Sequence, residues 1–73
     1  MMLKVSNAVN AKWANAQAMH SNSFTIPVKG KTYTIENKRN GFSVYNRKHE
    51  LIVSEVSNTE DLSNCLIMLS NSL

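Results

Sequence analysis

Residues 24–56 predict the central part of the fold. Their sequence is FTIPVKGKTYTIENKRNGFSVYNRKHELIVSEV. It contains four short runs rich in β-branched and aromatic residues, FTIPV, TYTIEN, FSVYN and LIVSEV, and turn-forming residues separate each run from the next. Pro27 has no N–H group to donate to a strand ladder, so the first strand is expected at an edge of the sheet. The segment therefore predicts a four-stranded antiparallel β-meander.

The alternation of side chains is consistent across the first three predicted strands. A two-residue turn at Lys29-Gly30 or at Gly30-Lys31 keeps the apolar residues of the first two strands on one face. Asn40-Gly41 predicts a type I′ turn, because both residues tolerate a positive φ, and a loop of two or of four residues there preserves the same face. A slip of one residue would turn this set outward. The residues predicted to share the inner face are Phe24, Ile26, Val28, Tyr33, Ile35, Phe42 and Val44.

The fourth strand is less determined than the other three. A preceding loop with an even number of residues would turn Leu51 and Val53 inward. A loop with an odd number would instead turn Ile52 and Val56 inward. In either register one apolar pair faces away from the main core, and Tyr45 of the third strand points to that outer face as well.

A helix is predicted before the strands, over residues 3–20, because apolar residues recur there at steps of three and four. Trp13 lies in the middle of this stripe and is expected to anchor the helix on the sheet. Asn22 is a candidate for the left-handed residue that ends the helix. The stripe comprises Met2, Val5, Val9, Trp13, Ala16 and Met19.

A second helix is predicted after the strands, over residues 60–71. Ser57 would cap its N-terminus through a capping box, and Thr59 is the alternative cap. Ile67 and Met68 make its apolar surface wider than one contact with a sheet needs. The core stripe of this helix comprises Leu62, Cys65, Leu66, Leu69 and Leu73.

The 73 residues are expected to form a single α+β domain, residues 1–73, in the order helix, four strands, helix. A domain of this size buries only about 60% of the surface that its unfolded chain exposes, so small proteins often add disulfides, metals or a second copy. Cys65 is the only cysteine, which excludes a disulfide within the chain. His20 and His49 show no metal-ligand spacing with it. A homodimer is therefore expected.

The charge and hydropathy of the chain place it among mildly basic proteins. Its formal net charge is +3 and its pI is near 9.3. This charge alone is weak evidence for nucleic-acid binding, because many small proteins carry as much for solubility. No signal peptide is recognised, and no run approaches the roughly 20 apolar residues of a membrane span. With a single cysteine, these features predict a cytoplasmic protein that does not associate with membranes.

No sequence motif for catalysis, a cofactor or a metal is recognised. Cys65 lies on an apolar stripe without a predicted base, so it is expected to be a buried structural thiol rather than a nucleophile. His20 and His49 lack a nucleophile, carboxylate or metal partner and are expected to be solvated. Glu60 and Asp61 are adjacent in the sequence and do not face each other on a helix, so they are not expected to form a catalytic carboxylate pair. Acidic residues are favourable near a helix N-terminus, and this accounts for their presence there. We expect a non-enzymatic protein with no catalytic residue, cofactor or metal.

Basic residues gather in the predicted turns. In a meander the first and third turns lie at the same end of the sheet, so their cations are expected to share one rim. Such a rim can bind phosphates or an acidic partner, whereas ordinary solvated turns would explain the same charges. The rim residues are Lys29, Lys31, Arg47 and Lys48, with His49 nearby, and Lys38 and Arg39 lie at the opposite end.

Surplus apolar surface is the second candidate feature. Tyr45, Ile67, Met68 and one apolar pair of the fourth strand exceed what a single small core uses. Contiguous exposed apolar surface marks an interaction site. Alternatively, the two helices could cover opposite faces of the sheet and absorb this excess.

Two resemblances follow from these patterns. The order of three strands and a helix over Thr32–Leu69 resembles the arm-type DNA-binding modules of phage integrases and the plant AP2 domain. This likeness is one of topology, and it implies nucleic-acid binding. The small size, the composition rich in Asn, Ser and Lys, and the absence of a catalytic motif resemble small phage-encoded proteins that block host defences or host machinery. No functional residue is carried over from either group.

The sequence favours a non-enzymatic protein-interaction module, such as a phage-encoded inhibitor of a host or anti-phage defence protein, that binds a partner surface as a homodimer. If the protein is phage-encoded, it would act in the host cytoplasm. The alternative is a small nucleic-acid-binding protein that uses the sheet and its basic turns. The candidate contacts for a partner or a nucleic acid are Lys29, Lys31, Tyr45, Arg47, Lys48, Ile67 and Met68.

Overall fold

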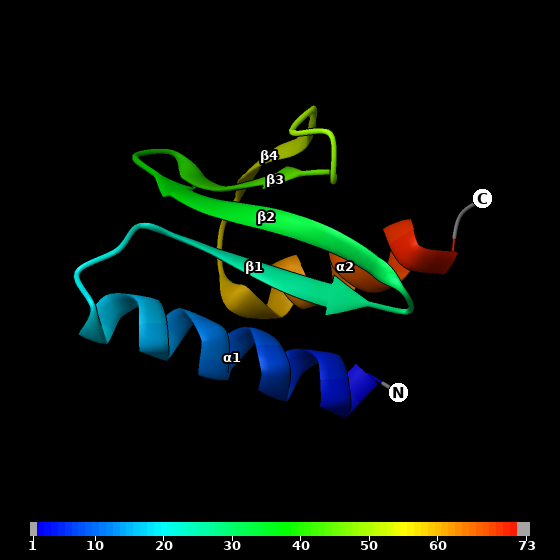
Figure 1. Cartoon of the computed structure of the whole chain (residues 1–73), viewed down its shortest axis with the longest axis horizontal. Coiled ribbons are helices and arrows are strands. Elements are labelled where there is room, and N and C mark those ends of the chain that lie inside the picture. The colour runs from blue at the N-terminus through cyan, green and yellow to red at the C-terminus, as the bar shows by residue number, and fades with distance from the viewer. Residues whose placement is uncertain (1, 72–73) are drawn as a thin grey trace.

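The computed structural model of the protein describes the backbone of residues 2–71 and the side chains of residues 5–71. Its strands form one antiparallel sheet in the order β1-β2-β3-β4 (Figure 1). The predicted α+β fold, a meander between two helices, is confirmed. Met2 and Leu73, which the sequence assigns to apolar stripes, lie outside the described side chains. The elements are α1 (Met2–Ala18), β1 (Ser23–Val28), β2 (Lys31–Lys38), β3 (Gly41–Tyr45), β4 (Leu51–Val56) and α2 (Thr59–Asn71).

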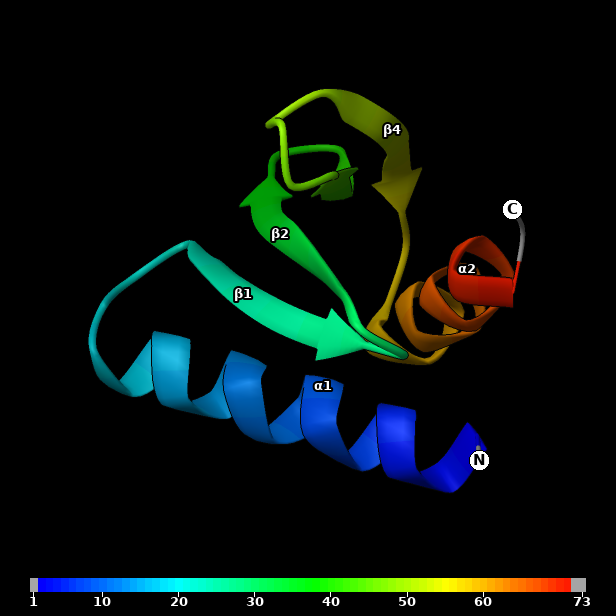
Figure 2. The same ribbon diagram turned by 45° about the vertical axis from the view of Figure 1, so that its right-hand side comes forward.

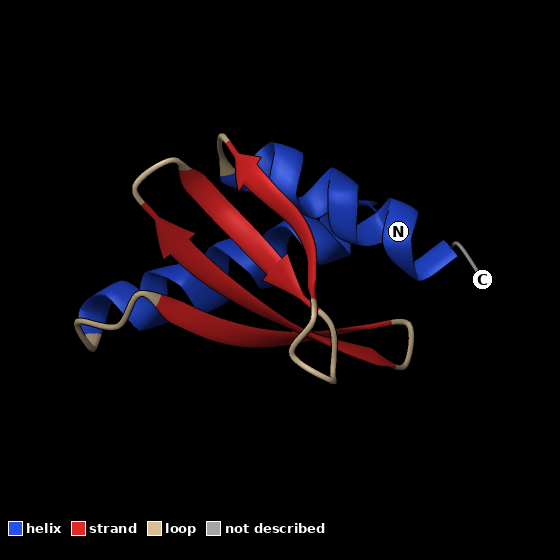
Figure 3. Ribbon diagram, turned by 90° about the horizontal axis from the view of Figure 1, so that it is seen from above, coloured by secondary structure: helices blue, strands red, loops and turns tan. Residues whose placement is uncertain are grey.

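Both helices pack against the same face of the sheet (Figures 2 and 3). Val9 of α1 and Leu62 and Leu66 of α2 are fully buried in one core with the strands. Trp13 of α1 packs edge-on against Phe42, with the ring centroids 5.3 Å apart. The alternative in which the helices cover opposite faces is wrong, because one apolar stripe from each helix enters the same core. Within residues 2–71, neither helix covers the other face of the sheet.

The predicted inner face is confirmed on the first three strands. Ile35 and Val44 are directly opposite each other in the ladder, and both are fully buried. Phe24 is half-buried and packs against Trp13, with the ring centroids 6.1 Å apart. The strand residues buried in the core are Ile26, Val28, Tyr33, Ile35, Phe42, Val44 and Val56.

The hairpin between β1 and β2 closes through the two-residue turn Lys29-Gly30, one of the two turns that the sequence allows. The φ angles of these residues are 50° and 81°, the left-handed pair that a type I′ turn requires. Pro27 lies in β1, which is an edge strand as predicted. The first hairpin therefore places Lys29 of the turn and Lys31 of β2 at one end of the sheet.

The second hairpin has the register of the four-residue alternative, the loop over residues 38–41, with Asn37 opposite Phe42, and it adds one further pair, Lys38 with Gly41. Because β3 begins at Gly41, the turn residues are Arg39 and Asn40 rather than Asn40-Gly41. Gly41 has φ 131°, and a Cβ atom there would lie 2.6 Å from the backbone oxygen of Val56. Glycine is therefore required at position 41 because β3 and β4 approach closely there. The reason given by the sequence prediction, a type I′ turn with Gly41 as its second residue, does not apply. Either two-residue turn leaves the same residues facing inward.

β4 follows neither predicted register but combines one residue from each. Val53 and Val56 both pack on the core although they are three positions apart. The pairing with β3 shifts twice along this strand, and Glu55 has φ 59°. Such irregularity inserts an extra residue and bends the strand, so an argument from regular alternation fails here. Leu51 and Ile52 remain exposed.

The end of α1 differs from the prediction, which placed it at residue 20 with Asn22 left-handed. The N–H of Ser21 donates to the carbonyl oxygen of Ala16 at 2.8 Å, and the N–H of His20 donates to that of Gln17 at 3.0 Å. These two bonds define a Schellman motif, whose left-handed residue is His20, with φ 57°.

The start of α2 also differs from the prediction. The side-chain oxygen of Asn58 accepts a hydrogen bond from the N–H of Asp61 at 2.8 Å. The carbonyl oxygen of Asn58 accepts the first helical bond, from the N–H of Leu62 at 3.0 Å. Asn58 is therefore the N-cap, and neither Ser57 nor Thr59 has this role.

Candidate partner-binding pocket

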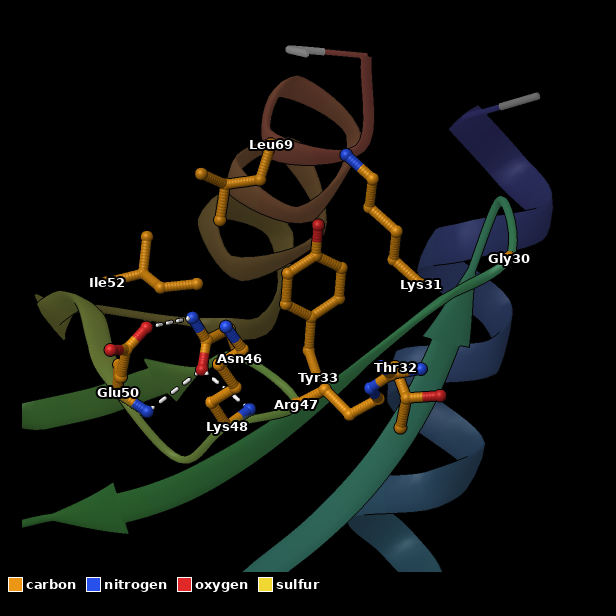
Figure 4. A pocket seen from close by; sticks show the side chains of 10 residues that line it. All are labelled: Gly30, Lys31, Thr32, Tyr33, Asn46, Arg47, Lys48, Glu50, Ile52 and Leu69. Atoms are coloured by element: carbon orange, nitrogen blue, oxygen red, sulfur yellow. Dashed lines mark hydrogen bonds between the residues drawn. The ribbon is translucent and has the colours of Figure 1, made fainter.

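A cavity of about 480 Å³ opens at the end of the sheet that carries the first and third turns (Figure 4). It lies between the start of β2, the loop that joins β3 to β4, the start of β4 and the C-terminal half of α2. Its volume falls within the range of about 300–1,000 Å³ typical of ligand pockets. We call it the basic–apolar pocket. Its lining residues are Gly30, Lys31, Thr32, Tyr33, Asn46, Arg47, Lys48, Glu50, Ile52 and Leu69.

Three cationic side chains, those of Lys31, Arg47 and Lys48, line the basic–apolar pocket. The prediction that the first and third turns bring their cations together is confirmed for these three. Lys29, the fourth predicted rim residue, donates a hydrogen bond from Nζ to Oδ1 of Asn71 at the end of α2. Glu50 supplies the single carboxylate among the lining residues. The pocket therefore has a net positive charge and attracts anionic groups.

Asn46 organises the loop that presents Arg47 and Lys48. Its Oδ1 accepts hydrogen bonds from the N–H groups of Lys48 and Glu50, each at 2.9 Å. Its Nδ2 donates to Oε1 of Glu50 at 2.8 Å, so the one acidic side chain of the lining is already engaged. This role of Asn46 was not predicted from the sequence. An Asn that opens a polar turn is the signal that could have indicated it, because its side chain often bonds to backbone groups that follow.

Tyr33 forms the floor of the pocket. Its ring belongs to the core and the residue is only 4% exposed, yet its hydroxyl points into the cavity between Leu69 and Lys31 (Figure 4). Burial raises the pKa of Tyr33 above its usual value of 10.0, so the hydroxyl stays protonated at neutral pH and can donate a hydrogen bond. The sequence predicted the inward ring but gave no sign that its hydroxyl reaches a cavity.

Ile52 and Leu69 supply the aliphatic part of the lining. Ile52 is 39% exposed, and Leu69 is half-buried. Met68, which precedes Leu69 on α2, is 72% exposed, whereas Ile67 is half-buried. Of the two α2 residues predicted as contacts, Met68 is therefore the more available to a partner. Leu69, which the sequence assigned to the core, reaches the pocket as well as the core.

Tyr45 does not line the pocket and lies on the outer face of the sheet. Its hydroxyl donates to Oε1 of Glu36 at 3.1 Å. The ring of His49 stacks on that of Tyr45, with the centroids 4.9 Å apart and the planes 14° apart. Nζ of Lys38 lies 5.6 Å from the centroid of the Tyr45 ring and 3.6 Å from Oε1 of Glu36. Tyr45, the one aromatic residue predicted to point outward on this face, is thus already in contact with Glu36, His49 and Lys38.

Cys65, predicted as a buried structural thiol, is half-buried and packs against the core. Among the described residues, no group of three His, Cys, Asp or Glu side chains could hold a metal ion. Neither described helix has the length and apolar character that a membrane crossing requires.

Comparison with protein-family models, curated proteins and solved structures finds no match to the chain.

Proposed function

We propose that this chain is a non-enzymatic interaction module that binds an acidic surface of a partner protein through the basic–apolar pocket. The observation that supports this proposal is that three cationic residues line the same cavity as the exposed Ile52 and the half-buried Leu69. Ordinary solvated turns would explain why cations lie at the rim. They would not explain why these cations line the same cavity as Ile52 and Leu69.

Charge and apolar contact have different roles in such an interface. Lys31, Arg47 and Lys48 would speed the encounter with an acidic partner and set its orientation. Ile52 and Met68, at 39% and 72% exposure, offer apolar area that folding of the monomer has not removed from water. Burial of that area would supply affinity at roughly 25 cal/mol per Å² before the costs of association are subtracted. The protein would then act by occupying its partner's surface, as an inhibitor does.

A charge-reversal pair tests this function. Partners captured from a lysate of the source organism are identified, purified and titrated against the wild-type chain and two double variants. R47E/K48E changes two pocket cations, and the matched control K12E/R39E changes one exposed Lys and one exposed Arg elsewhere. We expect the pocket variant to weaken binding by more than about tenfold and the control to leave it within about twofold. Equal losses in both variants, or none in either, would contradict the proposal.

Nucleic-acid binding is the second candidate function, and the uncovered outer face of the sheet favours it. Lys38 and Tyr45 lie there together, and cations next to aromatic rings are typical of single-strand binders. The stacking of His49 on Tyr45 argues against it, because that ring is already covered on one side. Fluorescence anisotropy with single- and double-stranded oligonucleotides at about 50 and 200 mM salt tests it. A salt-sensitive affinity that K38Q lowers would favour this function over protein binding.

A further inference from the structure

We infer that the basic–apolar pocket recognises a short peptide segment of the partner in which an acidic side chain lies close to a large apolar one. This inference rests on the proposed interaction function and specifies the chemistry of its ligand. Its basis is that the pocket offers two kinds of contact within one cavity of about 480 Å³, a volume that suits a few side chains better than a flat protein surface.

The backbone that carries Arg47 and Lys48 is held in place before any ligand arrives. Asn46 fixes the backbone of the loop through bonds of 2.9 Å to the N–H groups of Lys48 and Glu50. Arg47 and Lys48 therefore project from an ordered turn, which lowers the entropy lost on binding. A carboxylate accepts well from such cations, and a guanidinium can bind it through two parallel hydrogen bonds.

The apolar part of the pocket suits a Leu, Phe or Met side chain. Ile52 and Leu69 provide aliphatic contact, and the Tyr33 ring provides the floor. The protonated hydroxyl of Tyr33 points into the cavity, where it can donate to a carbonyl or carboxylate oxygen of the ligand (Figure 4). An apolar side chain here would cover surface that remains exposed at Ile52 in the free protein.

The carboxylate of Glu50 disfavours a dense polyanion in this pocket. It lies among the lining residues and is held by Asn46 at 2.8 Å, so a chain of phosphates would come close to a fixed negative charge. A peptide with a single carboxylate can place it near the cations and turn its apolar side chain toward Ile52. The pocket chemistry therefore selects an acidic peptide over a phosphodiester backbone.

Amide NMR of the 8.2 kDa chain tests this inference directly. The probes are three capped hexapeptide pools: one with Glu two positions from Leu or Phe, one with Gln in place of Glu, and one with Ser in place of the apolar residue. We expect the first pool to shift the amides of 30–33, 46–50, Ile52 and Leu69, and the other two to bind at least about tenfold more weakly. We expect K48Q and I52S to lose this response and R39Q, in the opposite turn, to retain it.

Four outcomes of the peptide and phosphate titrations would overturn the inference. These are the absence of saturable shifts, equal binding of the Gln pool, shifts centred on the outer face near Tyr45, or inorganic phosphate binding the same amides as tightly as the acidic pool. Shifts at the pocket that grow with protein concentration alone would also overturn it, because a second copy would then be the occupant. If peptides fail while R47E/K48E still abolishes capture of a partner, the proposed function stands and its ligand is a folded surface.

Discussion

Substitution of Gly41 by Ala is expected to destabilise the protein strongly, for two additive reasons. Its φ of 131° lies where residues with a side chain are strained, at a cost of about 1–3 kcal/mol. The new Cβ would also lie 2.6 Å from the backbone oxygen of Val56, and backbone cannot move as a flexible side chain can. The end of β4 must shift, which disturbs the buried Val56. We expect a total loss of about 3 kcal/mol or more, against a stability of roughly 4–11 kcal/mol for a domain of this length.

Gly30→Ala is the matched control for this prediction. Gly30 also has a positive φ, 81°, but its Cβ would meet no heavy atom within 4 Å. Only the backbone cost of about 1–2 kcal/mol for a side chain in the left-handed region applies to it. Urea denaturation followed by Trp13 fluorescence measures both variants, and the extra loss in Gly41→Ala reports the steric contribution together with the difference in backbone strain between the two positions. A Gly41→Ala variant no less stable than Gly30→Ala would refute the argument from close approach.

Four further predictions concern the helix end, the loop, the floor of the pocket and the oligomeric state. His20→Gly is expected to raise stability by about 0.5–1 kcal/mol in urea denaturation, because glycine adopts the left-handed φ without strain. Asn46→Ala should lose about 1–2 kcal/mol through its loop hydrogen bonds, and it should increase amide hydrogen exchange in residues 47–50. In a Tyr45→Phe background, the absorbance of the remaining phenol should titrate above pH 10, because burial raises the pKa of Tyr33. Tyr33 ionises at lower pH in the unfolded chain than in the folded one, so the free energy of unfolding should fall as the pH rises past 10. Light scattering is expected to give a homodimer, twice the 8.2 kDa mass, and Leu51→Glu to give a folded monomer, because that side chain is 56% exposed in the fold; a wild-type monomer would contradict this.

Much of the fold was predictable from the sequence, because side chains alternate between the two faces of a strand and this alternation restricts how the strands of a meander can pair. Once a two-residue turn was assigned, the inward placement of Tyr33, Ile35 and Val44 followed from alternation alone. The same reasoning failed on β4, since it assumes a regular strand and the irregularity at Glu55 removes that assumption. The cap of α2 was missed by one residue, because several adjacent polar residues can all accept from a helix N-terminus and only the path of the backbone selects Asn58.

The candidate site was predictable only in its charges. Topology placed Lys31, Arg47 and Lys48 at one end of the sheet, and the structure brings them around one cavity. The contributions of Ile52 and Leu69 depend on how far α2 extends beneath the curved sheet. The length of α2 agrees with the predicted range, but its position against the curved sheet is a tertiary property that no local pattern in the sequence encodes.

The irregular end of β4 also has a consequence for aggregation. β4 is an edge strand that begins with three apolar residues, Leu51 to Val53, and such an edge offers a template on which further chains can stack as fibrils. The left-handed Glu55 interrupts the straight ladder after a few residues and adds a charge, while Pro27 removes a donor from the opposite edge. Each open border of the sheet therefore carries a feature that limits its growth into a larger sheet.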